Sequence, residues 1–162
     1  MRRRLLLAGA LAPVLPALGT PPATDQPVVD WPAIALLDGR VWSPASWRQQ
    51  PAVVVVWATY CGFCRRHNAH IDRLHRDAPG LRVLGVALDG DAEAVRRYMA
   101  QQGHGFAVAL DQGQLRQRLT SRRSIPMTCL LDRQGRLRQA IPGEMAEADV
   151  LGLARQLLPA GA

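Results

Sequence analysis

Two cysteines, Cys61 and Cys64, stand three positions apart in the segment WATYCGFC, residues 57–64. An apolar run precedes this segment and a helix-like pattern follows it, so the pair lies where a strand passes into a helix. Two thiols with this spacing can close into a disulfide and reopen. The amides and the dipole at a helix start stabilise a thiolate on the first cysteine most. We therefore assign Cys61 as the nucleophile and Cys64 as the resolving thiol of a redox-active disulfide.

The same cysteine spacing is also half of a zinc site. His67 would be a third ligand, and His70 or His104 would have to supply the fourth. A copper or zinc chaperone that uses Cys61, Cys64 and His67 is therefore an alternative from a different class of protein. No methionine-rich or histidine-rich tract accompanies these residues. We expect no bound metal and no cofactor.

The segment WATYCGFC resembles the active site of the thioredoxin superfamily. Far downstream, SIPMT (residues 124–128) resembles the cis-proline loop of the same superfamily. With its LDxxGxL ending, the stretch from Ser124 to Leu137 is most similar to the extracytoplasmic TlpA/ResA/DsbE-like thiol-disulfide oxidoreductases. The resemblance covers about Trp31 to Leu158. It implies an α/β thioredoxin fold, in which helices flank a central mixed sheet, with an N-terminal β-hairpin and a central helix–strand insertion.

The resemblance also implies which residues form the site. The Ile125–Pro126 bond is expected to be cis and to lie against the disulfide, which adds Pro126 to the catalytic residues. The Ile125 backbone would pair with an extended substrate chain. One of Trp57 and Tyr60 should pack beneath the dithiol, and the other should lie on an exposed rim. The expected substrate-contacting residues are Trp57, Tyr60, Gly62, Phe63 and Ile125.

In function, the resemblance favours a disulfide reductase. Its partners would be protein disulfides, among them the haem-binding cysteines of apocytochrome c, and a membrane electron donor of the DsbD or CcdA kind that reduces the enzyme again. A disulfide oxidase or isomerase is the alternative among enzymes, because Gly62-Phe63 resembles the Gly-Tyr pair of periplasmic isomerases. We expect a monomer.

Three positions depart from the family pattern, one of them Ala69, where relatives carry a helix-kinking proline. Thioredoxin relatives carry an acidic or amide residue where this chain has Val55, and many carry Glu where it has His67. One hypothesis makes His67 a structural residue that is partly buried and hydrogen-bonded. The other makes it the proton acceptor for the Cys64 thiol in place of the missing acid.

The hydrophobic pattern indicates one α/β domain. The run at 53–57 shows no polar alternation, which predicts a strand covered on both faces. A hairpin is expected at 33–37 and 40–42, followed by a short helical turn at 43–50. Further strands are expected at 53–57, 81–88, 106–110, 127–131 and 137–141, and helices at 62–78, 92–101, 112–119 and 145–158. Cys129 falls in a central strand, where we expect a small buried core residue.

The N-terminal residues have the parts of a secretory signal. Three arginines at positions 2–4 precede an apolar run that ends in small residues. We expect a signal peptide at 1–19, a proline-rich linker at 20–30 and a thioredoxin-like domain at 31–160, with the protein in the periplasm. An uncleaved membrane anchor is the alternative reading of residues 1–19.

The net charge does not point to nucleic acid. The chain carries 20 basic residues, all of them arginine, 13 acidic residues and a formal charge of +7. Without the three arginines of the expected signal the balance is 17 minus 13, or +4. We interpret most of these arginines as solvated, while a basic rim near the dithiol would favour acidic partners.

Overall fold

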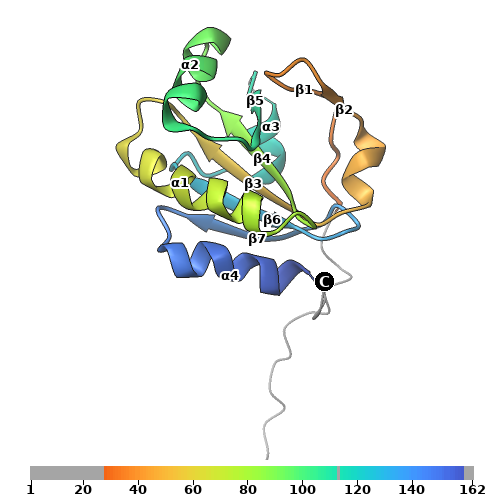
Figure 1. The fold of residues 1–162 in the computed structure, drawn as a ribbon. Coiled ribbons are helices and arrows are strands. Elements are labelled where there is room, and N and C mark those ends of the chain that lie inside the picture. Colours follow the sequence, from red (N-terminus) through yellow and green to blue (C-terminus); the bar gives the residue numbers. More distant parts are fainter. Residues whose placement is uncertain (1–27, 113, 159–162) are drawn as a thin grey trace, which may run out of the picture.

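A computed structural model describes residues 28–112 and 114–158 of the chain (Figure 1). The core element is β3 (Ala52–Trp57), and its six residues are all buried. Neighbouring β4 (Arg82–Ala87) and β5 (Ala107–Leu110) run parallel to it. The antiparallel pair β6 (Met127–Leu131) and β7 (Leu137–Pro142) continues the sheet on the other side. The order is β5-β4-β3-β6-β7, so the sheet is mixed, as expected.

Two helices cover one face of this sheet. They are α1 (Gly62–Asp77), which follows β3, and α4 (Glu147–Leu157), which packs beside it (Figure 1). The core on this face contains Val53, Val55 and Trp57 from β3. Part of α2 (Ala92–Gln102) joins the same core through Val95.

The other face is covered by the N-terminal segment and a short helix, α3 (Leu115–Leu119). The segment contains a two-stranded hairpin, β1 (Ile34–Ala35) with β2 (Val41–Trp42), and the 3₁₀ helix η1 (Pro44–Arg48). Successive side chains of a strand point to opposite faces, so alternate residues of each strand belong to this core and to the core on the first face. Val54 and Val56 of β3 lie in it, together with Leu115 and Leu119.

The observed elements follow the expected order, including the hairpin and the inserted pair α2 and β5. Two helices start later than the sequence pattern predicts. Asp111 accepts the Arg116 N–H at 2.7 Å and its carbonyl receives the Gln114 N–H, so α3 begins only at Leu115. The last helix starts at Glu147 instead of residue 145.

The chain joins the fold slightly before the expected domain boundary. Val28 forms an isolated bridge with Arg136, and Val29 donates its N–H to the Gly135 carbonyl at 2.9 Å. The last residues of the expected linker therefore pair with the β6–β7 hairpin. The expected signal at 1–19 lies outside the described residues.

Candidate active site

Cys61 and Cys64 form a disulfide at the start of α1, as predicted, with their Cα atoms 5.2 Å apart. Cys61 is the N-cap residue of the helix, and its Sγ accepts the Cys64 backbone N–H at 3.1 Å. An N-terminal amide aimed at a sulfur stabilises negative charge on that sulfur when the disulfide is open. The helix start therefore favours a thiolate on Cys61.

The two sulfurs differ in access to solvent. Cys61 is half-buried, while Cys64 is fully buried in the core shared by β3 and α1. An incoming molecule can reach only the first sulfur without displacing protein atoms. This asymmetry agrees with the assignment of Cys61 as nucleophile and Cys64 as resolving thiol.

The loop before β6 lies against the disulfide. The Ile125–Pro126 bond is cis, which confirms the expectation from the resemblance. The Ile125 carbonyl oxygen is 4.0 Å from Cys61 Sγ, and Gly143 donates its N–H to the Pro126 carbonyl at 2.8 Å. The loop is thus held between the dithiol and the end of β7.

The aromatic residues near the dithiol are of two kinds: two are exposed beside it and one is buried beneath it. Tyr60 and Phe63 are 75% and 61% exposed and flank the half-buried sulfur. Gly62, between the cysteines, is also exposed. Trp57 was expected to contact substrate, but it is fully buried and packs on Tyr98 with ring centroids 5.2 Å apart. It therefore supports the loop from beneath, because a β3 residue of that face points into the core.

His67 is fully buried one turn beyond Cys64, and both of its ring nitrogens are occupied. The Met145 backbone N–H donates to Nδ1 at 3.3 Å. The neutral ring then carries its proton on Nε2, which donates to Thr128 Oγ1 at 2.9 Å. Burial lowers the His67 pKa from 6.5 to about 4, with a further lowering from His70 and an opposing effect of Glu144. The ring is a neutral connector between α1, β6 and the segment before α4.

A carboxylate that the sequence pattern did not single out fixes the loop before Cys61. Asp89 accepts the Thr59 backbone N–H at 3.1 Å and also the Thr59 hydroxyl. The parallel strands β3 and β4 end at the same edge of the sheet, so residues that follow them meet there. The order of the two parallel strands therefore predicts a contact between the residues that follow β3 and those that follow β4. The nearby N-cap residue of α2 is Asp91, whose side chain accepts the Glu93 N–H at 2.9 Å.

Cys129 lies on the opposite face of the sheet from the disulfide. It is fully buried in the core with Val54 and Val56, as expected for a packing residue. Burial raises the pKa of its thiol to about 12. A neutral thiol on the far side of β6 takes no part in exchange at Cys61.

A metal site would need several ligand side chains close together, and the part of the chain that the structure describes contains no such set. No group of three or more His, Cys, Asp or Glu side chains there is arranged to hold a metal ion. His67 in particular directs its ring nitrogens to Thr128 and Met145. Among the same residues, none of the helices has the length and apolar character needed to cross a membrane.

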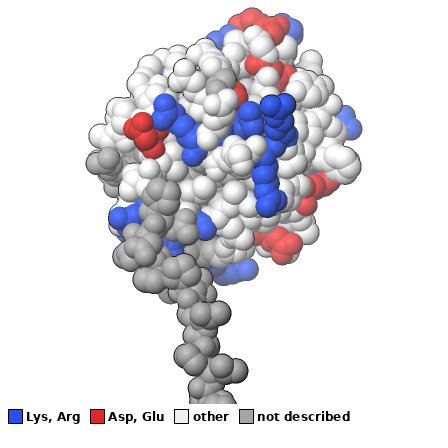
Figure 2. Space-filling view, turned by 180° about the vertical axis from the view of Figure 1, so that it is seen from behind, with Lys and Arg blue, Asp and Glu red and all other residues white. Residues whose placement is uncertain are grey.

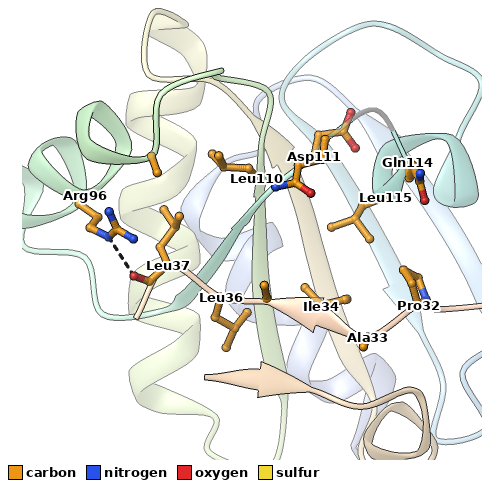
Figure 3. Close-up of a pocket in the computed structure, with 13 residues that line it drawn as sticks. Pro32, Ala33, Ile34, Leu36, Leu37, Arg96, Leu110, Asp111, Gln114 and Leu115 are labelled. Atoms are coloured by element: carbon orange, nitrogen blue, oxygen red, sulfur yellow. Dashed lines mark hydrogen bonds between the residues drawn. The ribbon is translucent and has the colours of Figure 1, made fainter. Parts of the chain in front are cut away.

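A cavity of about 390 Å³ lies between the N-terminal segment, α2 and the residues after β5 (Figure 3). Arg96 of α2 reaches across and donates from Nε to the Leu37 carbonyl at 2.9 Å. Apolar side chains such as Ile34 and Leu115 line the cavity beside Asp111. None of its lining residues belongs to the dithiol or to the cis-proline loop.

The fold and the dithiol together define the class: a thioredoxin-fold protein with a Cys-x-x-Cys disulfide opposed by a cis-proline loop. Within that class the chain belongs to the Redoxin family, whose sequence model matches residues 23–157.

Individual relatives agree with this assignment. The thiol-disulfide oxidoreductase ResA of Bacillus thuringiensis is 28% identical over 105 residues, which are 64% of this chain and 61% of the relative. The thiol:disulfide interchange protein DsbE of Escherichia coli is 30% identical over 64 residues, 40% of this chain and 34% of the relative. The chain thus spans about three-fifths of the length of the first of these curated relatives and a third of the second.

Among solved structures, a thiol:disulfide interchange protein of the thioredoxin family from Chlorobium tepidum superposes with a TM-score of 0.70. It is 22% identical, and the match covers 76% of this chain and 90% of that protein. The likeness establishes the thioredoxin fold.

Proposed function

We propose that the protein is a thiol-disulfide oxidoreductase that acts outside the cytoplasm and reduces disulfides of other proteins. The observation that carries the proposal is the Cys61–Cys64 disulfide at the start of α1, with the accessible sulfur beside the cis Ile125–Pro126 bond. The names of the ResA and DsbE relatives support the same chemistry.

In the reducing direction, the Cys61 thiolate attacks a substrate disulfide. A mixed disulfide forms between Cys61 and one substrate sulfur, and the other substrate sulfur leaves as a thiolate that takes up a proton. The Cys64 thiol then loses its proton and attacks Cys61 Sγ. The second substrate thiol leaves reduced, and Cys61 and Cys64 are again bridged.

The cis-proline loop would position the substrate for this attack. In the described structure the Ile125 N–H makes no hydrogen bond, and its carbonyl lies 4.0 Å from Cys61 Sγ. An extended substrate segment can pair with this backbone and place its sulfur beside Cys61. Tyr60 and Phe63 provide exposed apolar surface on either side.

The scheme needs a group that accepts the proton of the Cys64 thiol. Val55, on the strand beneath the dithiol, has no acidic group, and both His67 nitrogens already have partners. We therefore propose that His67 acts as a positioning residue, which holds Thr128 and the cis-proline loop in place, and that water accepts the proton. The direct proton-acceptor role of His67 is the competing hypothesis.

After each turnover the protein must be reduced again, and we propose a membrane electron donor of the DsbD or CcdA kind for this step. The resemblance to the ResA and DsbE branch makes apocytochrome c a candidate client. The signal-like residues 1–19 support export to the periplasm. A disulfide isomerase or oxidase remains the alternative, for which Gly62-Phe63 between the cysteines is the supporting feature.

The experiment that tests the activity is dithiothreitol-driven reduction of insulin. The protein should accelerate it, Cys61→Ser should abolish the acceleration, and Cys64→Ser should accumulate a mixed disulfide that is visible on a non-reducing gel. The redox potential of the cysteine pair then decides the direction. A potential near about −270 mV favours a reductase and one near about −120 mV favours an oxidase. About one equivalent of zinc or copper in a protein without turnover would instead identify a metal chaperone.

A further inference from the structure

Four arginines belong to the two segments that form the dithiol site and are called the basic rim: Arg65, Arg66, Arg122 and Arg123. The first two directly follow Cys64 in α1. The other two precede Ile125 by two and three residues. Successive Cα atoms are about 3.8 Å apart, so the Cα of Arg123 lies within about 8 Å of that of Ile125. The Ile125 carbonyl is itself 4.0 Å from Cys61 Sγ, so both pairs of arginines lie within three residues of groups that form the dithiol site.

Most of the charge of the basic rim is not neutralised. Arg66 pairs with Glu144 through two contacts, at 2.8 and 2.6 Å. The side chains of Arg65, Arg122 and Arg123 are exposed and make no ion pair with any residue of the described structure. The Asp89 carboxylate, which accepts hydrogen bonds from Thr59, sets one negative charge against these three cations. The segments that flank the dithiol therefore carry an excess of positive charge.

The face turned away from the viewer in Figure 1 also carries grouped basic side chains. In Figure 2, blue basic side chains gather near the middle of this face, while most red acidic side chains lie toward its margin.

Exposed apolar surface adjoins the basic rim. The exposed rings of Tyr60 and Phe63 flank Cys61, and the Arg66 guanidinium lies 5.1 Å from the centre of the Phe63 ring. Apolar surface beside unpaired cations is complementary to a polypeptide that carries carboxylates around an apolar stretch. A polypeptide with basic flanks would meet like charges at the same positions.

We infer that this surface selects protein substrates whose disulfide is flanked by aspartate or glutamate residues. The inference rests on the proposed oxidoreductase function and adds the class of substrate to it. The chemistry is unchanged: Cys61 attacks the substrate disulfide, Cys64 resolves the mixed disulfide, and dithiothreitol reduces the protein again. The basic rim raises the rate of encounter, which electrostatic steering can increase tenfold or more at low salt.

The test uses three peptides with one identical internal disulfide and flanks of aspartate, serine or lysine. Their reduction by the reduced protein is followed at about 20 mM and about 500 mM salt. At low salt kcat/KM should be about tenfold higher for the aspartate peptide than for the serine peptide, and lowest for the lysine peptide. High salt should remove most of this difference, because the Debye length falls to a few ångströms. Arg123→Glu should reduce the aspartate-to-serine ratio at least threefold.

Arg155→Glu is the matched control, because it makes the same charge change at an exposed position near the end of α4, away from the dithiol. It should leave the aspartate-to-serine ratio within a factor of two. Equal rates for the aspartate and serine peptides at low salt, or equal effects of Arg123→Glu and Arg155→Glu, would overturn the inference. Failure to reduce any of the three peptides, or insulin, would instead reject the oxidoreductase function itself.

Discussion

The Nε2 atom of His67 lies 2.9 Å from the hydroxyl oxygen of Thr128, and this hydrogen bond joins α1 to β6 two residues after the cis-proline. Thr128 is the cross-strand partner of Val55, so the two side chains share one face of the sheet. His67 and Thr128 thus form a buried polar pair beside the position at which thioredoxin relatives carry an acid. Their contact gives the site a neutral connection in place of a charge.

The first prediction concerns this pair and the resolving step. His67→Ala and Thr128→Val should each slow the attack of Cys64 on the mixed disulfide by roughly tenfold, because misplacement of a reacting group lowers the rate steeply. Neither should shift the pH dependence of that step between pH 5 and 9. Acid quenching and gel analysis of the mixed disulfide would provide the rates.

A proton-acceptor role for His67 gives a different pattern. Only His67→Ala would then slow resolution, Thr128→Val would behave as the wild type, and His67→Glu would restore part of the rate with its pH dependence moved downward. Observation of that pattern would refute the positioning role.

The second prediction concerns the effect of pH on stability. Burial lowers the His67 pKa from 6.5 to about 4, so the unfolded chain binds a proton in a range where the folded protein does not. This contribution to the free energy of unfolding is fully present above pH 6.5 and is lost as the pH falls toward 4. A shift of this size corresponds to about 3 kcal/mol.

Urea unfolding of the oxidised protein from pH 4 to 8 measures the effect. The fall in stability below pH 6.5 should be clearly smaller in His67→Gln than in the wild type. His75→Gln, at a partly exposed position of the same helix, is the control and should keep the wild-type slope. Parallel curves for the wild type and His67→Gln would contradict the prediction.

The third prediction concerns the close packing of Trp57 on β4. A Cβ atom at Gly85 would lie 2.7 Å from Trp57 Nε1 and 2.8 Å from the Phe106 ring, both closer than real Cβ contacts. Gly85→Ala should therefore destabilise the protein by about 2 kcal/mol, since buried rings must shift to make room. Gly90→Ala meets nothing within 4 Å and is the control. Equal urea midpoints for the two variants would show that the core adapts without cost.

The fourth prediction concerns the reactivity of the third cysteine. Cys129 is fully buried and its thiol has a pKa raised to about 12. In the native reduced protein at pH 8, a disulfide reagent should react with Cys61, and attack of Cys64 on the resulting mixed disulfide should release a second equivalent, while Cys129 should react only after denaturation. Cys129→Ala should leave insulin reduction unchanged. Rapid labelling of Cys129 in the native protein would mean that this face of the sheet opens in solution.

The sequence alone determined the order of the elements and the reacting pair. Continuous apolar runs at 53–57 and 127–131 predict strands that are covered on both faces, and the spacing of Cys61 and Cys64 allows a disulfide at a helix start. These features are local, because a strand, a helix start and a short disulfide ring depend on residues close together in the chain. The cis Ile125–Pro126 bond followed from resemblance to a family motif.

Tertiary structure decided what depends on residues distant in the chain. His67 and Thr128 are 61 positions apart, and only the packing of α1 on β6 shows that the histidine is neutral and has both nitrogens bonded. The same holds for Asp89, which reaches Thr59 because two parallel strands end at one edge. The motif left open which of Trp57 and Tyr60 packs beneath the dithiol, and the pleat of β3 turns Trp57 into the core. Sequence specifies which groups are present, while their hydrogen bonds and burial follow from how the sheet and helices pack.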